Sequence, residues 1–159
     1  MRIRIIAIGK VKELYLSNGI NEYINRLKPY TNIEIIEVND EPIPDKPNDS
    51  EIKLAINKEG ERVIKLLKTS DYVISLDLNK KEMTSEEFAI YLNRKIEIGG
   101  SNITFIIGGS YGLSEALKNR ANDAISLSKM TFLHQMTRLI LLEQIYRAFK
   151  INHHETYHK

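Results

Sequence analysis

The residue types change twice within the stretch Ile103-Thr104-Phe105-Ile106-Ile107-Gly108-Gly109-Ser110-Tyr111-Gly112-Leu113-Ser114. Apolar and β-branched residues come first, three glycines follow, and the serine at the end is a residue type that begins helices. The pattern predicts a buried strand at 103–107, a loop whose backbone can approach a ligand closely, and then a helix. Because ligands of α/β proteins bind beyond the carboxyl ends of the strands, the loop is a candidate nucleotide or cofactor site.

The glycine loop is not a dinucleotide-binding fingerprint, which requires G-x-G-x-x-G. When Gly109 and Gly112 take the last two glycine positions, Ile107 stands where the first should be. The chain also contains no Walker A sequence. A tight turn that uses glycine only for positive φ angles is the alternative interpretation.

Outward from this stretch, short apolar runs alternate with segments of helical spacing. Further strands are predicted at 2–8, 33–38, 72–78 and 124–127, and helices at 20–27, 54–67, 84–98, 114–122 and 136–150. Thr84 and Glu87 have the spacing of a capping box at the start of the third helix. Continuous apolar strands are typical of sheets covered on both faces. We therefore predict a single α/β domain over residues 1–159, with a mostly parallel sheet flanked by helices.

Composition narrows the class of protein. A chain of 159 residues with 42% hydrophobic and 28% charged residues is typical of one soluble globular domain. It has no cysteine, which excludes disulfides and thiolate metal sites and is consistent with a reducing compartment. The apolar part of residues 1–9 is too short for a secretory signal, and no run is long enough to span a membrane. We expect a cytoplasmic protein without a membrane partner.

The net charge of +2 is spread unevenly. Basic residues outnumber acidic ones in 1–30 and in 129–159, whereas acidic residues dominate between them. If the fold brings the two ends together, they form one anion-binding surface. An ordinary fluctuation in the charge of a solvated surface explains the same pattern.

A second candidate site is the segment from Ala124 to His134, where a short apolar run leads into mixed hydroxyl and apolar residues. Its backbone could hydrogen-bond an adenine edge while Leu127, Met130 and Phe132 cover the faces of the ring. The alternative is a strand-to-helix connector whose apolar residues belong to the core.

The end of the chain offers residues suited to RNA. Arg138 and Arg147 could bind phosphates, a histidine could act as general acid or base, and Tyr157 could stack on a base. A disordered tail is one alternative. Adventitious metal binding by His153-His154-x-x-x-His158 is another, although no carboxylate triad or cysteine pair supports a dedicated metal site.

Together these segments closely resemble the RlmH family of RNA methyltransferases, which belongs to the SPOUT class. The likeness covers essentially the whole chain, and its motifs are Ile6-Ala7-Ile8-Gly9-Lys10, Lys58-Glu59-Gly60-Glu61, residues 107–113, residues 127–138, residues 143–151 and Tyr157-His158-Lys159. The resemblance implies a fold with a C-terminal trefoil knot and a homodimer whose active sites are each completed by the partner subunit. It also implies S-adenosylmethionine as cofactor. The implied reaction is methylation of N3 of a pseudouridine in 23S (large-subunit) ribosomal RNA, on assembled ribosomes.

The resemblance also assigns roles to residues. The residues that it implies for cofactor binding are Leu76, Gly108, Leu127, Ser128, Lys129, Met130, Thr131 and Phe132. For the substrate step it implies Tyr157, His158 and Arg138. In the mechanism that we expect, His158 is the base, Tyr157 positions the ring, and Arg138 holds phosphate or developing negative charge.

One segment departs from the family pattern. Many members have Arg-Gly-Glu-Pro before the final Tyr-His, whereas this chain has His153-His154-Glu155-Thr156. Two rival functions also stay open on the sequence. One is a non-catalytic nucleotide- or ribosome-binding module, and the other is a metal-dependent hydrolase that uses the histidine tail.

Overall fold

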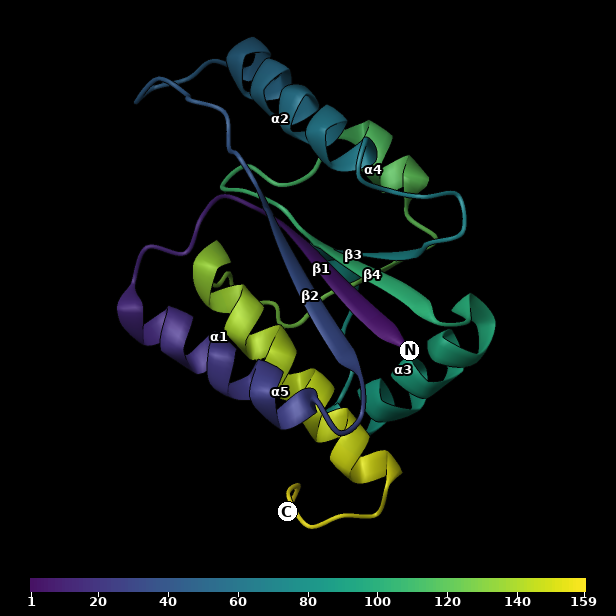
Figure 1. Ribbon diagram of the computed structural model, residues 1–159. Helices are drawn as coiled ribbons and strands as arrows, with labels where there is room; N and C mark the ends of the chain where they lie inside the picture. Colours follow the sequence, from purple (N-terminus) through teal and green to yellow (C-terminus); the bar gives the residue numbers. More distant parts are fainter.

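Five parallel strands form one sheet in the order β2-β1-β4-β3-β5, in a computed structural model that describes residues 1–159 (Figure 1). The strands are β1 (Arg2–Ile8), β2 (Asn32–Val38), β3 (Tyr72–Lys81), β4 (Asn102–Ile107) and β5 (Asp123–Ile125). The helices are α1 (Leu14–Leu27), α2 (Asp49–Ile64), α3 (Ser85–Gly99), α4 (Glu115–Arg120) and α5 (His134–Asn152). The predicted α/β class and flanking helices are confirmed, and the sheet is parallel throughout.

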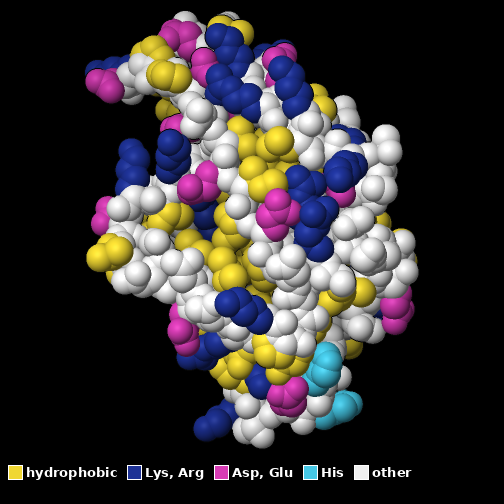
Figure 2. Space-filling model, in the orientation of Figure 1, with side chains coloured by type: hydrophobic (Ala, Val, Ile, Leu, Met, Phe, Trp, Pro, Cys, Tyr) yellow, Lys and Arg dark blue, Asp and Glu magenta, His cyan; other side chains and the backbone are white.

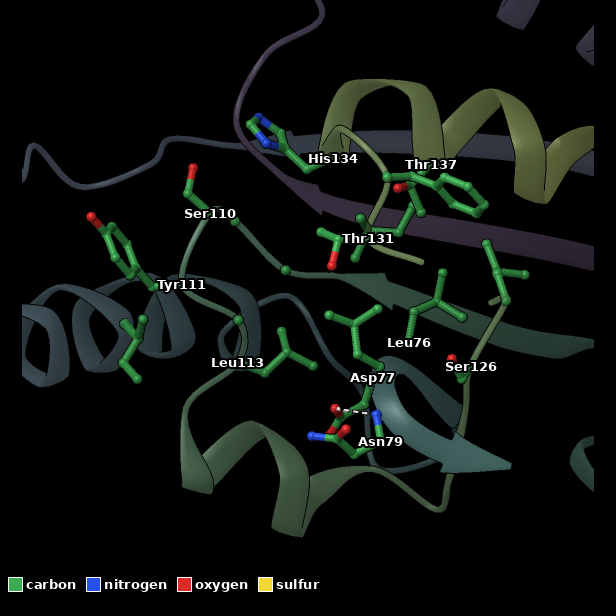
Figure 3. A pocket seen from close by; sticks show the side chains of 18 of the residues that line it. Leu76, Asp77, Asn79, Ser110, Tyr111, Leu113, Ser126, Thr131, His134 and Thr137 are labelled. Atoms are coloured by element: carbon green, nitrogen blue, oxygen red, sulfur yellow. Dashed lines mark hydrogen bonds between the residues drawn. The ribbon is translucent and has the colours of Figure 1, made fainter. Parts of the chain in front are cut away.

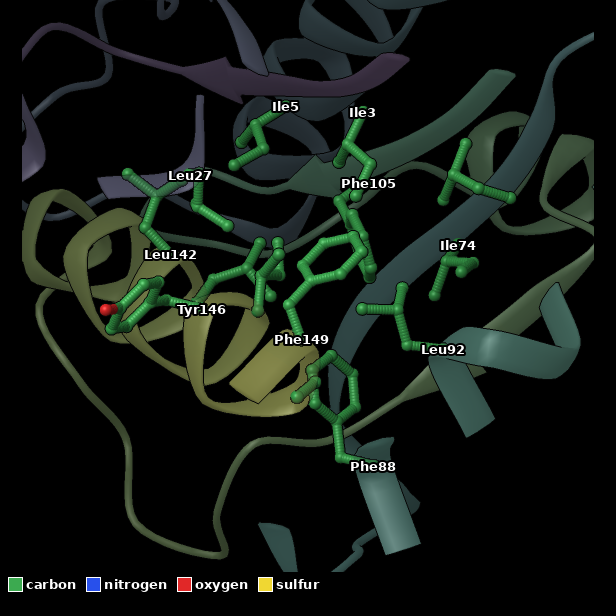
Figure 4. Close-up of a cluster of buried hydrophobic side chains, with 14 of the residues drawn as sticks. Ile3, Ile5, Leu27, Ile74, Phe88, Leu92, Phe105, Leu142, Tyr146 and Phe149 are labelled. Carbon is green, nitrogen blue, oxygen red and sulfur yellow. The ribbon is translucent and has the colours of Figure 1, made fainter. Parts of the chain in front are cut away.

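The two central strands are buried on both faces. On one face, Ile3 and Ile5 of β1 and Phe105 of β4 pack against α1, α3 and α5 (Figure 4). On the other face, Ile6 of β1 and Ile106 of β4 pack against α2 and α4. Figure 1 shows the same division, with α2 and α4 on one side of the sheet and the other helices across it. Because both faces are buried, the sequences of β1 and β4 are almost continuous apolar runs.

Capping residues set the beginnings of three helices. The predicted capping box is present, since Thr84 Oγ1 accepts from the Glu87 amide and the Glu87 carboxylate accepts from the Thr84 amide. Ser114 caps α4 in the same way through the amide of Leu117. The start predicted for the second helix was wrong by five residues, because Asn48 caps the helix before its apolar spacing begins.

Three other boundaries differ in ways that shape the candidate site. The fifth strand ends at Ile125 rather than at residue 127, so Ser126 to Leu133 is free to form a loop. The last helix begins at His134 rather than at residue 136. The third strand extends to Lys81, with an irregular register beside β5. The C-terminal trefoil knot that the resemblance implies stays a prediction.

The C-terminus of α5 closes with paired backbone hydrogen bonds. The amide of His154 donates to the carbonyl of Ile151 at 3.0 Å, and the amide of Glu155 donates to that of Lys150 at 2.9 Å. This is the Schellman pattern, which requires a left-handed residue at the position of His154. His154 has a φ of 55°, the only positive value at a non-glycine residue. The position is the one where the usual family pattern has glycine.

The His154→Gly variant is therefore expected to be more stable than the parent protein. Glycine adopts the left-handed conformation without the steric cost of a side chain, and the expected gain is about 0.5–1 kcal/mol. Chemical denaturation followed by circular dichroism measures it. An equal or lower stability would mean that the His154 side chain contributes more than its conformation costs.

No helix of the protein is both long and apolar enough to cross a membrane.

Candidate functional site

A cavity of about 990 Å³ lies beyond the carboxyl ends of β3 and β4. Three segments form most of its wall, namely residues 76–79 in the second half of β3, residues 107–113 after β4, and residues 126–134 between β5 and α5, and α2 and α4 add the rest. In Figure 3, Leu76, Leu113 and Thr131 surround the middle of the cavity. His134 and Ser110 lie toward one side of this view, and Asp77 and Asn79 toward the other. The glycine loop and the 124–134 segment, which are far apart in sequence, are therefore parts of one site.

The glycine loop folds tightly enough to leave no room for a side chain at Gly108. A Cβ atom there would lie 3.1 Å from the carbonyl carbon and oxygen of Gly112 and 3.1 Å from a methyl group of Leu113. The amide of Gly112 donates to the carbonyl of Gly109 at 3.1 Å, which closes the turn. Gly112 has a φ of 88°, so the turn needs glycine there too. The backbone of Gly108 thus faces the cavity directly.

The wall segment at residues 126–134 is shaped by local hydrogen bonds between side chains and backbone. Ser126 Oγ donates to the carbonyl of Ser128 at 2.9 Å, and Ser128 Oγ accepts from the amide of Met130 at 3.0 Å. These bonds turn the chain after β5 and direct its apolar residues to the cavity. The candidate cofactor residues that line the cavity are Leu76, Gly108, Leu127, Ser128, Met130, Thr131 and Phe132. Lys129 is the exception, because its side chain is exposed and does not line the wall.

His134 is a cavity residue for which no role was predicted. It begins α5 with its ring at the edge of the cavity, and it accepts or donates no hydrogen bond. Burial, followed by the positive charge of Arg138, lowers the pKa of His134 below its ordinary value. The ring is therefore neutral at pH 7. The clue in the sequence was its place at the end of the candidate adenine-binding segment.

The C-terminal tail is packed against α5 and is not free. The hydroxyl of Tyr157 donates to Glu143 Oε1 at 3.1 Å and lies 3.2 Å from the hydroxyl of Tyr23. The Arg147 guanidinium lies over the Tyr157 ring, 4.7 Å from its centroid. Burial and the bond with Tyr23 raise the pKa of Tyr157, so its hydroxyl stays protonated near neutrality.

His158 is held between two charged side chains. Its Nδ1 lies 3.1 Å from Arg147 Nη1, and its Nε2 lies 2.8 Å from Glu86 Oε1. Arginine can only donate and an ionised carboxylate can only accept. The contacts therefore select the neutral tautomer with the hydrogen on Nε2, which leaves Nδ1 as the acceptor.

Arg147, and not Arg138, is the arginine that the structure places with Tyr157 and His158. Arg138 is completely buried, and its guanidinium donates to Glu37 Oε2 at 2.6 Å and to the carbonyls of Ile8 and Gly9. These contacts join α5 to the ends of β1 and β2. In this position Arg138 has no open path to a phosphate, which disfavours the role predicted for it in the substrate step. Arg147 is partly exposed beside Tyr157 and His158.

The Arg138→Ala variant is expected to lose stability, by roughly 2–4 kcal/mol, because two carbonyls and Glu37 lose their hydrogen-bond donor. The free energy of unfolding in urea measures this. Arg26→Ala is the control, since Arg26 forms an exposed pair with Glu22 at 2.8 Å and its loss is expected to change stability far less. Similar losses in the two variants would contradict a structural role for Arg138.

The histidines of the tail do not converge. His153 Nδ1 lies 2.9 Å from the carbonyl of Phe149, His154 is exposed, and His158 is engaged with Arg147 and Glu86. No three histidine, aspartate or glutamate side chains of the protein come together as a metal site would need.

The geometry can be set beside known proteins. The sequence profile of a family described as "Predicted SPOUT methyltransferase" matches residues 1–158. The chain belongs to the SPOUT methyltransferase family. Three relatives, each called "Ribosomal RNA large subunit methyltransferase H", are similar over the full length of both chains. They come from Carboxydothermus hydrogenoformans (50% identical), Symbiobacterium thermophilum (50%) and Bacillus cereus (48%). The family resemblance noted in the sequence is thus confirmed.

Within one chain of this SPOUT methyltransferase, the cavity and the C-terminal tail lie at different positions along α5. Thr137 lines the cavity, whereas Glu143 and Arg147 hold the tail. These positions lie about 9 and 15 Å farther along the axis of α5. Tyr157 and His158 therefore do not contribute to the cavity wall of their own chain.

Proposed function

We propose that this protein uses S-adenosylmethionine to methylate N3 of a pseudouridine in large-subunit ribosomal RNA. The observation that carries the proposal is the cavity at the ends of β3 and β4, where Gly108 presents bare backbone to the interior. Full-length similarity to relatives named as large-subunit rRNA methyltransferases supports the choice of substrate. Ribosomes as the substrate would place the protein in the cytoplasm.

The cavity has the features that the cofactor requires. Backbone groups of the glycine loop and of residues 127–132 can hydrogen-bond its polar edges, and Leu76, Leu113 and Phe132 offer apolar surface to its adenine ring. Lys129 would bind the cofactor through its backbone and not through its side chain. When bound, the cofactor supplies a methyl group already activated by a sulfonium. The protein therefore has mainly to position the acceptor and remove its proton.

His158 is the proposed acceptor of that proton. Pseudouridine N3 is protonated at neutral pH. Nδ1 of His158 carries a lone pair whose one hydrogen bond within the protein comes from Arg147. When N3–H replaces this bond, the proton passes to Nδ1. Nη1 of Arg147 is then free to stabilise the negative charge that develops on the pseudouridine, while Nε and Nη2 stay bonded to Glu143. Tyr157 keeps its proton and positions the pseudouridine ring.

This chemistry requires a homodimer in which the tail of one subunit reaches the cavity of the other. The tail is anchored too far along its own α5 to serve the cavity of its own chain. Four large apolar side chains are also exposed: Met130 (75%) and Leu133 (52%) on the cavity wall, and Leu14 (74%) and Tyr15 (62%) at the start of α1. Single exposed apolar residues are ordinary, but exposed apolar residues on the wall of a site favour an interface. The interface would be the same patch on both subunits.

The test measures S-adenosylhomocysteine formed by the purified protein with S-adenosylmethionine and ribosomes from a bacterium lacking this methylation. We expect product that depends on ribosomes and reaches about one equivalent per large subunit. A non-catalytic ribosome-binding module would bind ribosomes and form no product. A metal-dependent hydrolase would be inhibited by a chelator and indifferent to the cofactor.

A further inference from the structure

The cavity is larger than its cofactor-binding wall requires. Its volume of about 990 Å³ is at the upper end of the range of roughly 300–1,000 Å³ typical of a site for one small molecule. The second half of β3 and the loops after β4 and β5 form one part of the wall. The opposite part comes from two helices, α2 with Lys53, Ile56 and Asn57, and α4 with Glu115 and Lys118. None of these helix residues is among the candidate cofactor residues.

The two helices form a rigid support for this part of the wall. Gly60 of α2 packs so closely on α4 that a Cβ atom there would lie 2.2 Å from Ser114 Oγ. Val63 and Leu117 are completely buried between the same helices and the sheet. The backbone positions of Lys53 and Lys118 are therefore fixed relative to the cavity, and only their side chains can move.

Both lysines are available to an external anion. Lys53 is exposed and has no acidic partner, and Lys118 has only a 3.7 Å contact with the highly exposed Glu115. Other basic residues of α2 are engaged, since Lys58 and Arg62 both pair with Glu41. An exposed pair of this length contributes little, so Lys118 can exchange its partner readily. Figure 2 shows apolar side chains along the middle of this face below α2, with lysine and arginine side chains around them.

Tyr111 adds an aromatic ring to the same opening. It belongs to the glycine loop, lines the cavity and is 46% exposed. Its hydroxyl makes no hydrogen bond within the protein, and its ring packs against no other aromatic ring or cation. Positive charge around an exposed aromatic side chain is the combination by which proteins bind single-stranded nucleic acid.

We propose that Lys53, Lys118 and Tyr111 hold the single-stranded RNA that flanks the nucleotide in the cavity. The two ammonium groups contact backbone phosphates, and the Tyr111 ring stacks on an adjacent base. The proposal rests on the proposed function, because it takes ribosomal RNA as the partner. It assigns the α2–α4 side of the opening to RNA and leaves the loop side to the cofactor.

The test compares the binding of three variants to unmethylated ribosomes by co-sedimentation over a range of KCl concentrations. The double variant Lys53→Glu/Lys118→Glu is expected to bind roughly tenfold more weakly, and its log–log salt dependence should fall by about 1.4, or about 0.7 for each lost phosphate contact. Tyr111→Ala should also bind roughly tenfold more weakly, while Tyr111→Phe keeps the ring and the affinity. Calorimetry should give each variant the same affinity for S-adenosylmethionine as the parent protein.

Lys65→Glu is the matched control. Lys65 is exposed and unpaired at the end of α2, about 18 Å along the helix axis from Lys53, and it does not line the cavity. Its variant should bind ribosomes as the parent protein does. Equal loss in this control, normal binding by the double variant, or lost cofactor affinity in the double variant would each overturn the proposal. Parent protein that binds ribosomes without transferring methyl would contradict the proposed function alone, whereas failure to bind at all would overturn this inference.

Discussion

The Gly108→Arg variant is expected to lose binding of S-adenosylmethionine by roughly 100-fold or more, and with it methyl transfer. Even a Cβ atom at this position would lie 3.1 Å from the backbone of Gly112, and the rest of the arginine would have to extend into the cavity. The space for the adenine or for the rest of the cofactor is then filled. Calorimetric titration of parent and variant measures the effect.

The control for this prediction must separate a blocked site from an unfolded protein. The thermal unfolding of the variant without cofactor should remain cooperative, since Gly108 follows the carboxyl end of β4 and belongs to neither cluster of buried apolar residues. Ser110→Ala removes a hydroxyl from the same loop without adding volume and should bind the cofactor within a few-fold of the parent. Retained binding by folded Gly108→Arg would place the cofactor elsewhere.

The His158→Ala variant is expected to transfer methyl groups roughly 100-fold more slowly, with unchanged cofactor affinity. The reason is that His158 Nδ1 is the proposed proton acceptor, although His158 does not line the cavity of its own chain. Single-turnover methyl transfer to ribosomes measures the rate, and calorimetry measures the affinity. An unchanged rate would remove His158 from the role of base.

A mixed dimer makes this prediction sharper. In a heterodimer of Gly108→Arg and His158→Ala chains, a cross-subunit arrangement gives one site with both lesions and one site with neither. About half of the parent activity should then return, although each homodimeric variant is nearly inactive. If cavity and tail of the same chain formed each site, every site would carry a lesion and no activity would return.

The sequence predicted the parts of the fold that depend on local pattern. The apolar runs of β1 and β4 could be identified because both faces of these strands are buried. The capping box at Thr84 was also correct, since it needs only residues three positions apart. The end of β5 was not predictable in this way, because the strand ends where its pairing with the distant strand β3 stops, at Ile125.

Some residues of the candidate site could not be predicted for a similar reason. Arg138 and Arg147 are the same residue type on the same helix, and only the fold distinguishes them. Glu37, 101 positions away, binds Arg138 in the interior, whereas His158, 11 positions away, meets Arg147 near the surface. The position of Lys53 and Lys118 on one side of the cavity likewise depends on the packing of α2 on α4.

Identifying the modified nucleoside distinguishes methylation of pseudouridine N3 from every other reaction. Ribosomes lacking the modification are incubated with the protein and methyl-labelled S-adenosylmethionine, and the large-subunit RNA is digested and analysed by mass spectrometry. We expect one labelled 3-methylpseudouridine per large subunit, formed by the parent protein and absent with Gly108→Arg. Label on another nucleoside, or no label in the RNA of ribosomes that bind the protein, would contradict it.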